Sequence, residues 1–172
     1  SYKLFKQGVN KVIITHSPNN SVDHTIILGA NENSFEKSKH NIISSSICDA
    51  NACAPVLKII DEEFCINDAF ITTLHPWLGY QNLVDGSIKS VSSPGHYWTD
   101  FALGRSSTDS LIPKPTSLVS ALQKVLPNCT KNIYAMSMRV PTSIVSASDM
   151  ILSLEKSISL KEIEEVFSSK FS

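Results

Sequence analysis

The hydrophobic pattern changes its period near residue 48, and this change limits the folds open to the chain. Before it, three short segments rich in Ile and Val, 11–15, 24–28 and 41–45, lie between turn-forming residues. After it, apolar residues recur at the spacing of one helix face, at Cys53, Val56, Leu57, Ile60 and Phe64. The first part is therefore predicted to form short strands. Their adjacent Ile pairs are typical of a parallel sheet buried on both faces. A helix is predicted over 49–64.

The remaining segments predict a second kind of sheet. Strand character returns at 69–75, 133–140 and 144–154, and a helix is expected over 117–126. A capping-box sequence beginning at Ser159 predicts a last helix, with an apolar stripe of Leu160, Ile163, Phe167 and Phe171. This order favours an α+β domain with a largely antiparallel or mixed sheet and helices packed on one face.

Two segments need a separate interpretation. The stretch 85–109 is rich in Ser and Gly, but Tyr97, Trp98 and Phe101 favour an ordered, packed loop. In the first sheet, one helix candidate before Gly8 is too little to cover both faces. Residues 1–46 are therefore expected to be the end of a domain whose beginning is absent.

Pro55 is expected near the start of the helix predicted over 49–64, or at a bend in that helix.

Charge and cysteine content exclude several classes of protein. The 172 residues include 15 Lys and Arg against 16 Asp and Glu, with no basic run, so no nucleic-acid partner is expected. No segment is apolar for long enough to cross a bilayer, so no membrane association is expected. The four cysteines lack a C-x-x-C pair or zinc spacing, which predicts no metal site, reduced thiols and a cytoplasmic location. The chain starts at Ser1 rather than Met, which indicates an excised piece.

Cys48 is the best candidate for chemistry. It follows a predicted strand and precedes a predicted helix, where free backbone N–H groups and the helix dipole favour a thiolate. His75 ends a strand that begins after this helix, so the two strand ends could bring an imidazole to the sulfur as base. The alternative is that Cys48 has no chemical role and that His75 is an ordinary core or loop residue.

Several dispersed motifs resemble those of the phosphorylating glyceraldehyde-3-phosphate dehydrogenase family, in the same order. The run I-C-D-A-N-A-C-A-P around Cys48 is similar to the family's S-C-T-T-N-C-L-A-P, in which the first Cys is the nucleophile. T-T-L-H at 72–75, V-D-G at 84–86 and R-V-P-T at 139–142 follow, and His75 lies 27 residues after Cys48, as in the family. The resemblance implies that 1–46 ends a Rossmann-type dinucleotide-binding domain and that 47–172 is the catalytic domain, truncated at its C-terminus.

The resemblance implies oxidation of an aldehyde, glyceraldehyde 3-phosphate or a related one, with NAD as cofactor and NADP left open. Cys48 would form a thiohemiacetal and then a thioester with His75 as base, and its own N–H would help to hold the oxyanion. Phosphate would release the acyl group. The matching substrate- and phosphate-binding residues are Thr116, Arg105 and Arg139. Asn51 matches the family motif and would contact the cofactor. A role in glycolysis and a homo-oligomer, a tetramer, are also implied.

Four positions depart from the family. Ile47 and Asp49 stand where Ser and Thr donate to phosphate, Leu78 replaces a threonine, and Ser117 replaces a glycine. Ile47 cannot donate, and Asp49 would repel an anion by up to about 4 kcal/mol at ~4 Å. Alternatively, Asp49 only complements the helix N-terminus from the surface. Two further functions therefore stay open: an inactive relative that serves as a binding or assembly subunit, and a dehydrogenase that releases acid by hydrolysis.

Overall fold

The computed structural model describes residues 2–15, 22–79, 81–86, 104–129 and 132–170. The chain forms two compact units, each described by itself below. The first combines Ser1–Ala69, Ser117–Ile133 and Leu152–Ser172, and the second combines Phe70–Thr116 and Tyr134–Ile151. The aromatic residues of the predicted loop, Tyr97, Trp98 and Phe101, and Phe171 of the predicted last stripe lie outside the described residues. The predicted domain division after residue 46 stays a prediction.

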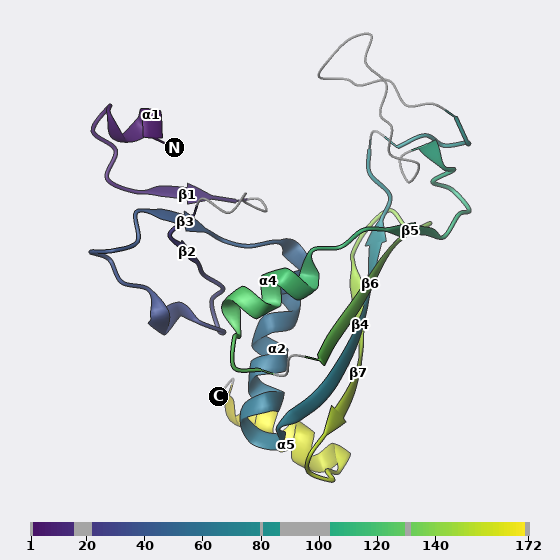
Figure 1. The fold of residues 1–172 in the computed structure, drawn as a ribbon. Helices are drawn as coiled ribbons and strands as arrows, with labels where there is room; N and C mark the ends of the chain where they lie inside the picture. The colour runs from purple at the N-terminus through teal and green to yellow at the C-terminus, as the bar shows by residue number, and fades with distance from the viewer. Residues whose placement is uncertain (1, 16–21, 80, 87–103, 130–131, 171–172) are drawn as a thin grey trace. The chain divides into compact units, whose positions relative to one another are not determined.

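The first unit begins with the helix α1 (Tyr2–Phe5) and a small parallel sheet (Figure 1). Its strands are β1 (Val12–Ile14), β2 (His24–Thr25) and β3 (Ile42–Ser44), with β3 in the middle and both pairs parallel. This arrangement confirms the parallel pairing predicted from the Ile pairs, but the predicted burial on both faces is wrong for β1, where Ile13 is 67% exposed. β2 is shorter than predicted because Asn31 turns the chain, donating to Thr25 O and accepting from Ile27 N. A short 3-10 helix, Glu32–Ser34, follows this turn.

The long helix α2 (Cys48–Phe64) forms the core of the first unit with α4 (Leu118–Val125). Six side chains of the two helices are fully buried: Ala50, Cys53, Ala54, Leu57, Leu118 and Leu122. Cys53 is thus a core residue, as its place on the helix stripe predicts. Pro55 lies inside α2 and not near its start, which corrects one of the two predicted positions.

Pro55 packs against a glycine that the fold requires. Gly29 has φ of +81°, and a Cβ at this position would lie 3.4 Å from the Pro55 side chain. Positive φ is unfavourable for residues with a Cβ. The turn after β2 therefore depends on glycine for its backbone conformation, while a Cβ there would be in ordinary van der Waals contact with Pro55 of α2.

Gly29→Ala should lower the free energy of unfolding by about 1 to 2 kcal/mol, because alanine must adopt the left-handed backbone conformation. Urea unfolding of the variant measures the loss. Gly79→Ala is the matched control, since a Cβ there meets no atom within 4 Å among the described residues. Equal stabilities of the two variants would contradict the prediction.

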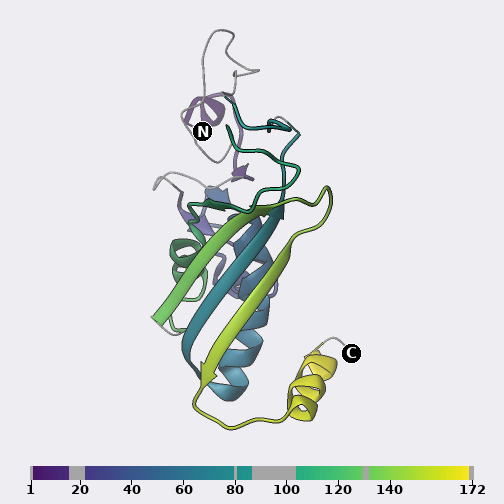
Figure 2. The ribbon, with the colours of Figure 1, turned by 90° about the vertical axis from the view of Figure 1, so that its right-hand side faces the viewer.

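The second sheet has the order β5, β6, β4, β7, with bounds Ile112–Lys114, Asn132–Val140, Ile66–Pro76 and Ala147–Leu154. β5 and β6 are antiparallel. Contacts between β4 and β6 advance along both strands, from Asn67 with Asn132 to Thr73 with Ser137, so this pair is parallel. Figure 2 shows β6, β4 and β7 side by side. The α+β class with a mixed sheet is confirmed.

β7 begins three residues later than predicted. Val145 has φ of +64°, which a strand does not accommodate, and Thr142 Oγ1 donates to the carbonyl oxygen of Ile144 at 3.2 Å. Residues 141–146 therefore form a turn between β6 and β7, which we call the β6–β7 turn. Ile144 and Val145 are 72% and 76% exposed in this turn.

The last helix, α5 (Leu160–Lys170), begins with the predicted capping box. Ser159 N and Oγ both donate to Glu162 Oε2 at 2.7 Å, and these two bonds, the backbone one first, hold the pKa of Glu162 below its ordinary value. Ile163, Val166 and Phe167 are half-buried, whereas Leu160 is 72% exposed. The stripe therefore begins one turn later than predicted.

Acidification should destabilise the protein in two stages. Burial, and then the neighbouring His40, lower the pKa of the His24 imidazole from 6.5, so stability contributed by neutral His24 is lost as the pH falls below that value. Backbone N–H groups of Ile42 and Asn41 lower the pKa of Asp23 from 3.8, so its contribution is lost only at more acid pH. Urea unfolding midpoints measured against pH test this. His24→Gln should remove the first stage and leave the second, and a variant that retained both would contradict the assignment.

Candidate active site

A strained turn places Cys48 at the first position of α2. Ser46, between β3 and α2, is buried and has φ of +64°, and its N–H donates to the buried Oγ of Ser44 at 3.0 Å. Ile47 is the extended N-cap residue, with no side-chain cap bond. Cys48 is exposed at this turn, and its role as nucleophile stays a prediction. No sequence signal indicated the strained Ser46, because serine carries no requirement for positive φ.

Asn51 fixes this turn from inside the helix. Its amide nitrogen donates to Ser45 O at 2.7 Å and to Ile47 O at 2.8 Å, so both N–H groups bind the backbone that leads to Cys48. The amide oxygen is the remaining group that could meet a cofactor. The predicted cofactor contact of Asn51 stays a prediction, and its structural role is to hold the turn that leads to Cys48.

Asp49 lies beside the candidate nucleophile and is buried. Asp49 is only 7% exposed. The Cys48 Sγ donates to the Asp49 Oδ1 at 3.6 Å. The alternative that Asp49 complements the helix from the surface is therefore wrong about its placement. The predicted repulsion of an anion by Asp49 stays a prediction.

His75 lies near the end of β4, in the second unit, and is 7% exposed. Its Nδ1 lies 3.5 Å from Ser146 Oγ of the β6–β7 turn. Cys48 belongs to the first unit, so the pairing of thiol and imidazole stays a prediction. Ser146 had no signal in the sequence, because a serine after a strand turn is common.

The predicted anion-binding residues have different surroundings. Arg139 Nη1 donates to Pro76 O at 2.9 Å, one residue beyond His75, so this guanidinium joins β6 to the end of β4. Arg105 is exposed and pairs with Asp85 at 3.4 Å. Thr116 is half-buried and directly precedes Ser117, the N-cap residue of α4. Arg139 and His75 are thus neighbours in one unit, and the anion-binding roles of all three residues stay predictions.

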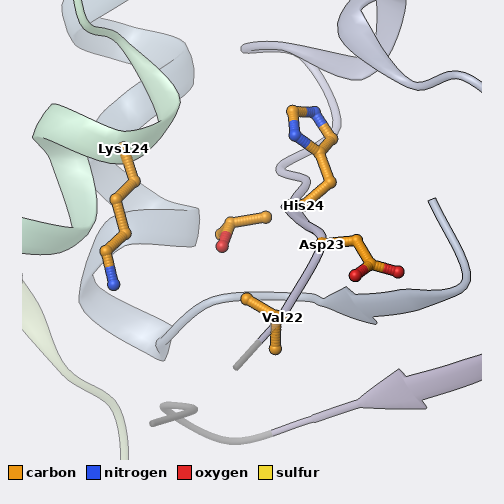
Figure 3. Close-up of a pocket in the computed structure, with 5 residues that line it drawn as sticks. Val22, Asp23, His24 and Lys124 are labelled. Carbon is orange, nitrogen blue, oxygen red and sulfur yellow. The ribbon is translucent and has the colours of Figure 1, made fainter. Parts of the chain in front are cut away.

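Two hollows lie in the first unit beside Lys124 of α4. The larger, of about 250 Å³, is lined by Val22, Asp23, His24 and Thr25 on the side of β2 (Figure 3). Figure 3 shows the Asp23 carboxylate turned away from Lys124, toward β3, where it accepts from Asn41 N and Ile42 N at 2.8 Å. The charges therefore do not form a pair across this hollow.

The smaller hollow lies closer to the Cys48 turn. It measures about 20 Å³ and is lined in part by Ser46, Ile47, Ser117 and Ser120. A space of this size holds about one water molecule. Ile47 lines it with a side chain that offers no hydrogen-bond donor.

In the part of the chain that the structure describes, no helix is both long and apolar enough to cross a membrane.

Comparison with known proteins defines the class of this chain. Residues 47–171 match the family model described as "Glyceraldehyde 3-phosphate dehydrogenase, C-terminal domain". "Glyceraldehyde-3-phosphate dehydrogenase 2" of Bacillus subtilis (strain 168) is 34% identical over 160 residues, covering 93% of this chain and 44% of that protein. "Glyceraldehyde-3-phosphate dehydrogenase" of Geobacillus stearothermophilus is 32% identical over 161 residues, covering 94% and 45%. The chain thus spans less than half the length of these relatives.

The chain belongs to the glyceraldehyde-3-phosphate dehydrogenase family. The resemblance identified from the dispersed motifs is confirmed.

Proposed function

We propose that the protein containing this chain oxidises an aldehyde with NAD or NADP, using Cys48 as nucleophile and His75 as base. The observation that carries the proposal is the exposed Cys48 at the start of α2, held by a buried, left-handed serine and by the Asn51 amide. Family membership supports the reaction class. Family membership also supports three further proposals: a cytoplasmic location, a role in glycolysis and a homotetrameric assembly.

The position of Cys48 next to the parallel sheet supports a bound dinucleotide. Dinucleotides bind outside the carboxyl ends of parallel strands, and Cys48 follows the carboxyl end of β3 in the parallel sheet. The Asn51 amide oxygen is the group on α2 that would meet it. When bound, the nicotinamide supplies the hydride acceptor that turns a thiohemiacetal into a thioester.

The chain's own residues would move the protons. His75 takes the Cys48 thiol proton while sulfur bonds to the aldehyde carbon, and returns that proton to the former carbonyl oxygen. It takes the hydroxyl proton again as the carbon loses hydride, and the C=O double bond re-forms as a thioester on Cys48. The N–H of Cys48, free at the helix start, stabilises the oxyanion that forms during addition.

Two versions of the proposed function differ in the molecule that accepts the acyl group from Cys48. Phosphate attack on the thioester would give an acyl phosphate and free Cys48, whereas water would give a carboxylic acid. The buried Asp49 carboxylate, 3.6 Å from the sulfur, and the apolar Ile47 support water. Turnover of the full-length protein with and without phosphate distinguishes them, since phosphate-independent turnover excludes obligatory phosphorolysis.

Iodoacetamide labelling tests the nucleophile directly. Cys48 should be alkylated selectively and with a pH-dependent rate, because it is exposed, whereas Cys53 and Cys129 are buried. In His75→Ala the rate at Cys48 should fall, because the base is lost. If Cys48 reacted no faster than Cys129, the protein would be better described as the inactive binding or assembly subunit.

A further inference from the structure

The end of β4, which carries His75, is joined to the β6–β7 segment by three contacts within the second unit. Arg139 Nη1 donates to Pro76 O at 2.9 Å, and Trp77 N donates to Thr142 O at 3.3 Å. The third contact is made by side chains alone, Ser146 Oγ with His75 Nδ1 at 3.5 Å. The first two contacts would hold the strand end without the third. The third therefore acts on the imidazole itself.

Ser146 reaches His75 from a strained backbone. Val145, directly before it, is β-branched and has φ of +64°, a conformation that such residues rarely adopt. Its side chain is 76% exposed, so burial gives no compensation for the strain. Strain of this kind persists where the surrounding structure imposes it, often at functional sites. Here the strained residue directs the next side chain, Ser146, toward the imidazole.

The Ser146 hydroxyl is committed to this contact. Within the described part of the chain, its Oγ makes no other hydrogen bond. By contrast, the Thr142 hydroxyl of the same turn donates to the Ile144 carbonyl and so stabilises the turn. The hydroxyls of Thr142 and Ser146 thus have different partners: the first bonds within the turn, and the second meets His75 at the end of β4.

We infer that Ser146 is a positioning residue that selects the tautomer of His75. This inference rests on the proposed function. When Nδ1–H donates to the Ser146 oxygen, Nε2 is left with a lone pair and can accept a proton from a thiol or a thiohemiacetal. The group bonded to one imidazole nitrogen sets the chemistry of the other, as carboxylates do for catalytic and metal-binding histidines. A serine hydroxyl can either accept from Nδ1–H or donate to a bare Nδ1, so the inference commits to the first arrangement, which adds no charge.

The distance is consistent with this role. At 3.5 Å the contact is at the long limit of a hydrogen bond, and hydrogen bonds in substrate-free active sites are often long and shorten in the substrate complex. Ser146 is a neutral partner and so orients the imidazole without adding a charge beside it.

Nuclear magnetic resonance of the protein labelled with 15N-histidine tests the inference at its source. Couplings between ring nitrogens and ring protons identify which nitrogen of His75 carries the proton. The Nδ1–H form should dominate in the wild type and lose its dominance in Ser146→Ala. It should be restored in Ser146→Thr, which keeps the hydroxyl. Ser143→Ala, in the same turn, is the matched control and should leave the tautomer unchanged. An unchanged tautomer in Ser146→Ala would overturn the inference.

Kinetics of the full-length enzyme provide the second measurement. Acylation of Cys48 should slow about tenfold in Ser146→Ala, the effect of one neutral hydrogen bond, with KM unchanged because the inference has Ser146 act only through His75. Ser146→Thr should recover most of the rate. If Ser146→Thr also acylated slowly, and both variants failed to fold, Ser146 would instead have a purely structural role. If the tautomer changed while acylation did not, Ser146 would still position His75, and the proposed role of His75 as base would fail.

Discussion

Asp49→Thr should raise the rate at which phosphate releases the acyl group from Cys48, by up to about 10³-fold. The buried Asp49 carboxylate lies beside the sulfur, and a phosphate dianion approaching the thioester would come within a few ångströms of it. At surface-like dielectric, each unit of like charge at ~4 Å costs about 4 kcal/mol. Threonine removes the charge and adds a hydroxyl donor. Single-turnover release from acylated enzyme, measured against phosphate concentration, gives the rate.

Two variants make this measurement decisive. Asp49→Asn removes the charge without adding a hydroxyl and should recover most of the gain if repulsion is the cause. Ile47→Ser adds a donor and keeps the charge, so it should gain less. If wild type and Asp49→Thr showed the same dependence on phosphate, Asp49 would not control the acceptor.

Leu57→Ala should lower the free energy of unfolding by about 2 to 5 kcal/mol, the usual effect of a cavity in a packed core. Leu57 is fully buried on α2 in the first unit, where α2 packs against α4. Because α2 begins at Cys48, loosening this helix should also reduce the selectivity of Cys48 alkylation. Urea unfolding measures the first effect, and peptide mapping after iodoacetamide measures the second.

Leu160→Ala is the control for this change, because Leu160 is 72% exposed at the start of α5. Its loss of stability should be within about 0.5 kcal/mol. Comparable losses in the two variants would mean that the contact between α2 and α4 is not the core of the first unit.

The sequence predicted those features that arise from periodicity and local chemistry. The helix of Cys48, the parallel strands before it and the capping box at Ser159 each follow from residues close together in the chain. The turn that places Cys48 was predicted in outline. Its rigid details were not, because Ser44, Ser46 and Asn51 act through backbone hydrogen bonds that no pattern of residue types reveals.

Tertiary placement accounts for the errors. A carboxylate in a first helical turn is usually solvated, so the sequence alone does not reveal that Asp49 is buried. The strand after residue 144 was predicted too early because Ile144 and Val145 have strong strand propensity. A bond from Thr142 and a left-handed Val145 instead make a turn. Ser146 gains a role only through the proximity of a strand that lies far away in sequence.

The contact between Ser146 and His75 also has a consequence for the folding kinetics of the protein. It joins residues that are 71 positions apart, and Lys156 of the first unit bonds Glu63 O across 93 positions. Closing such long loops loses chain entropy before any contact compensates for it, so non-local strand pairs form slowly. Helix α2, which carries Cys48, is local and can form early. Cys48 should therefore be in place on a nascent helix well before the His75 imidazole is oriented, and refolding monitored at His75 should lag behind refolding monitored at α2.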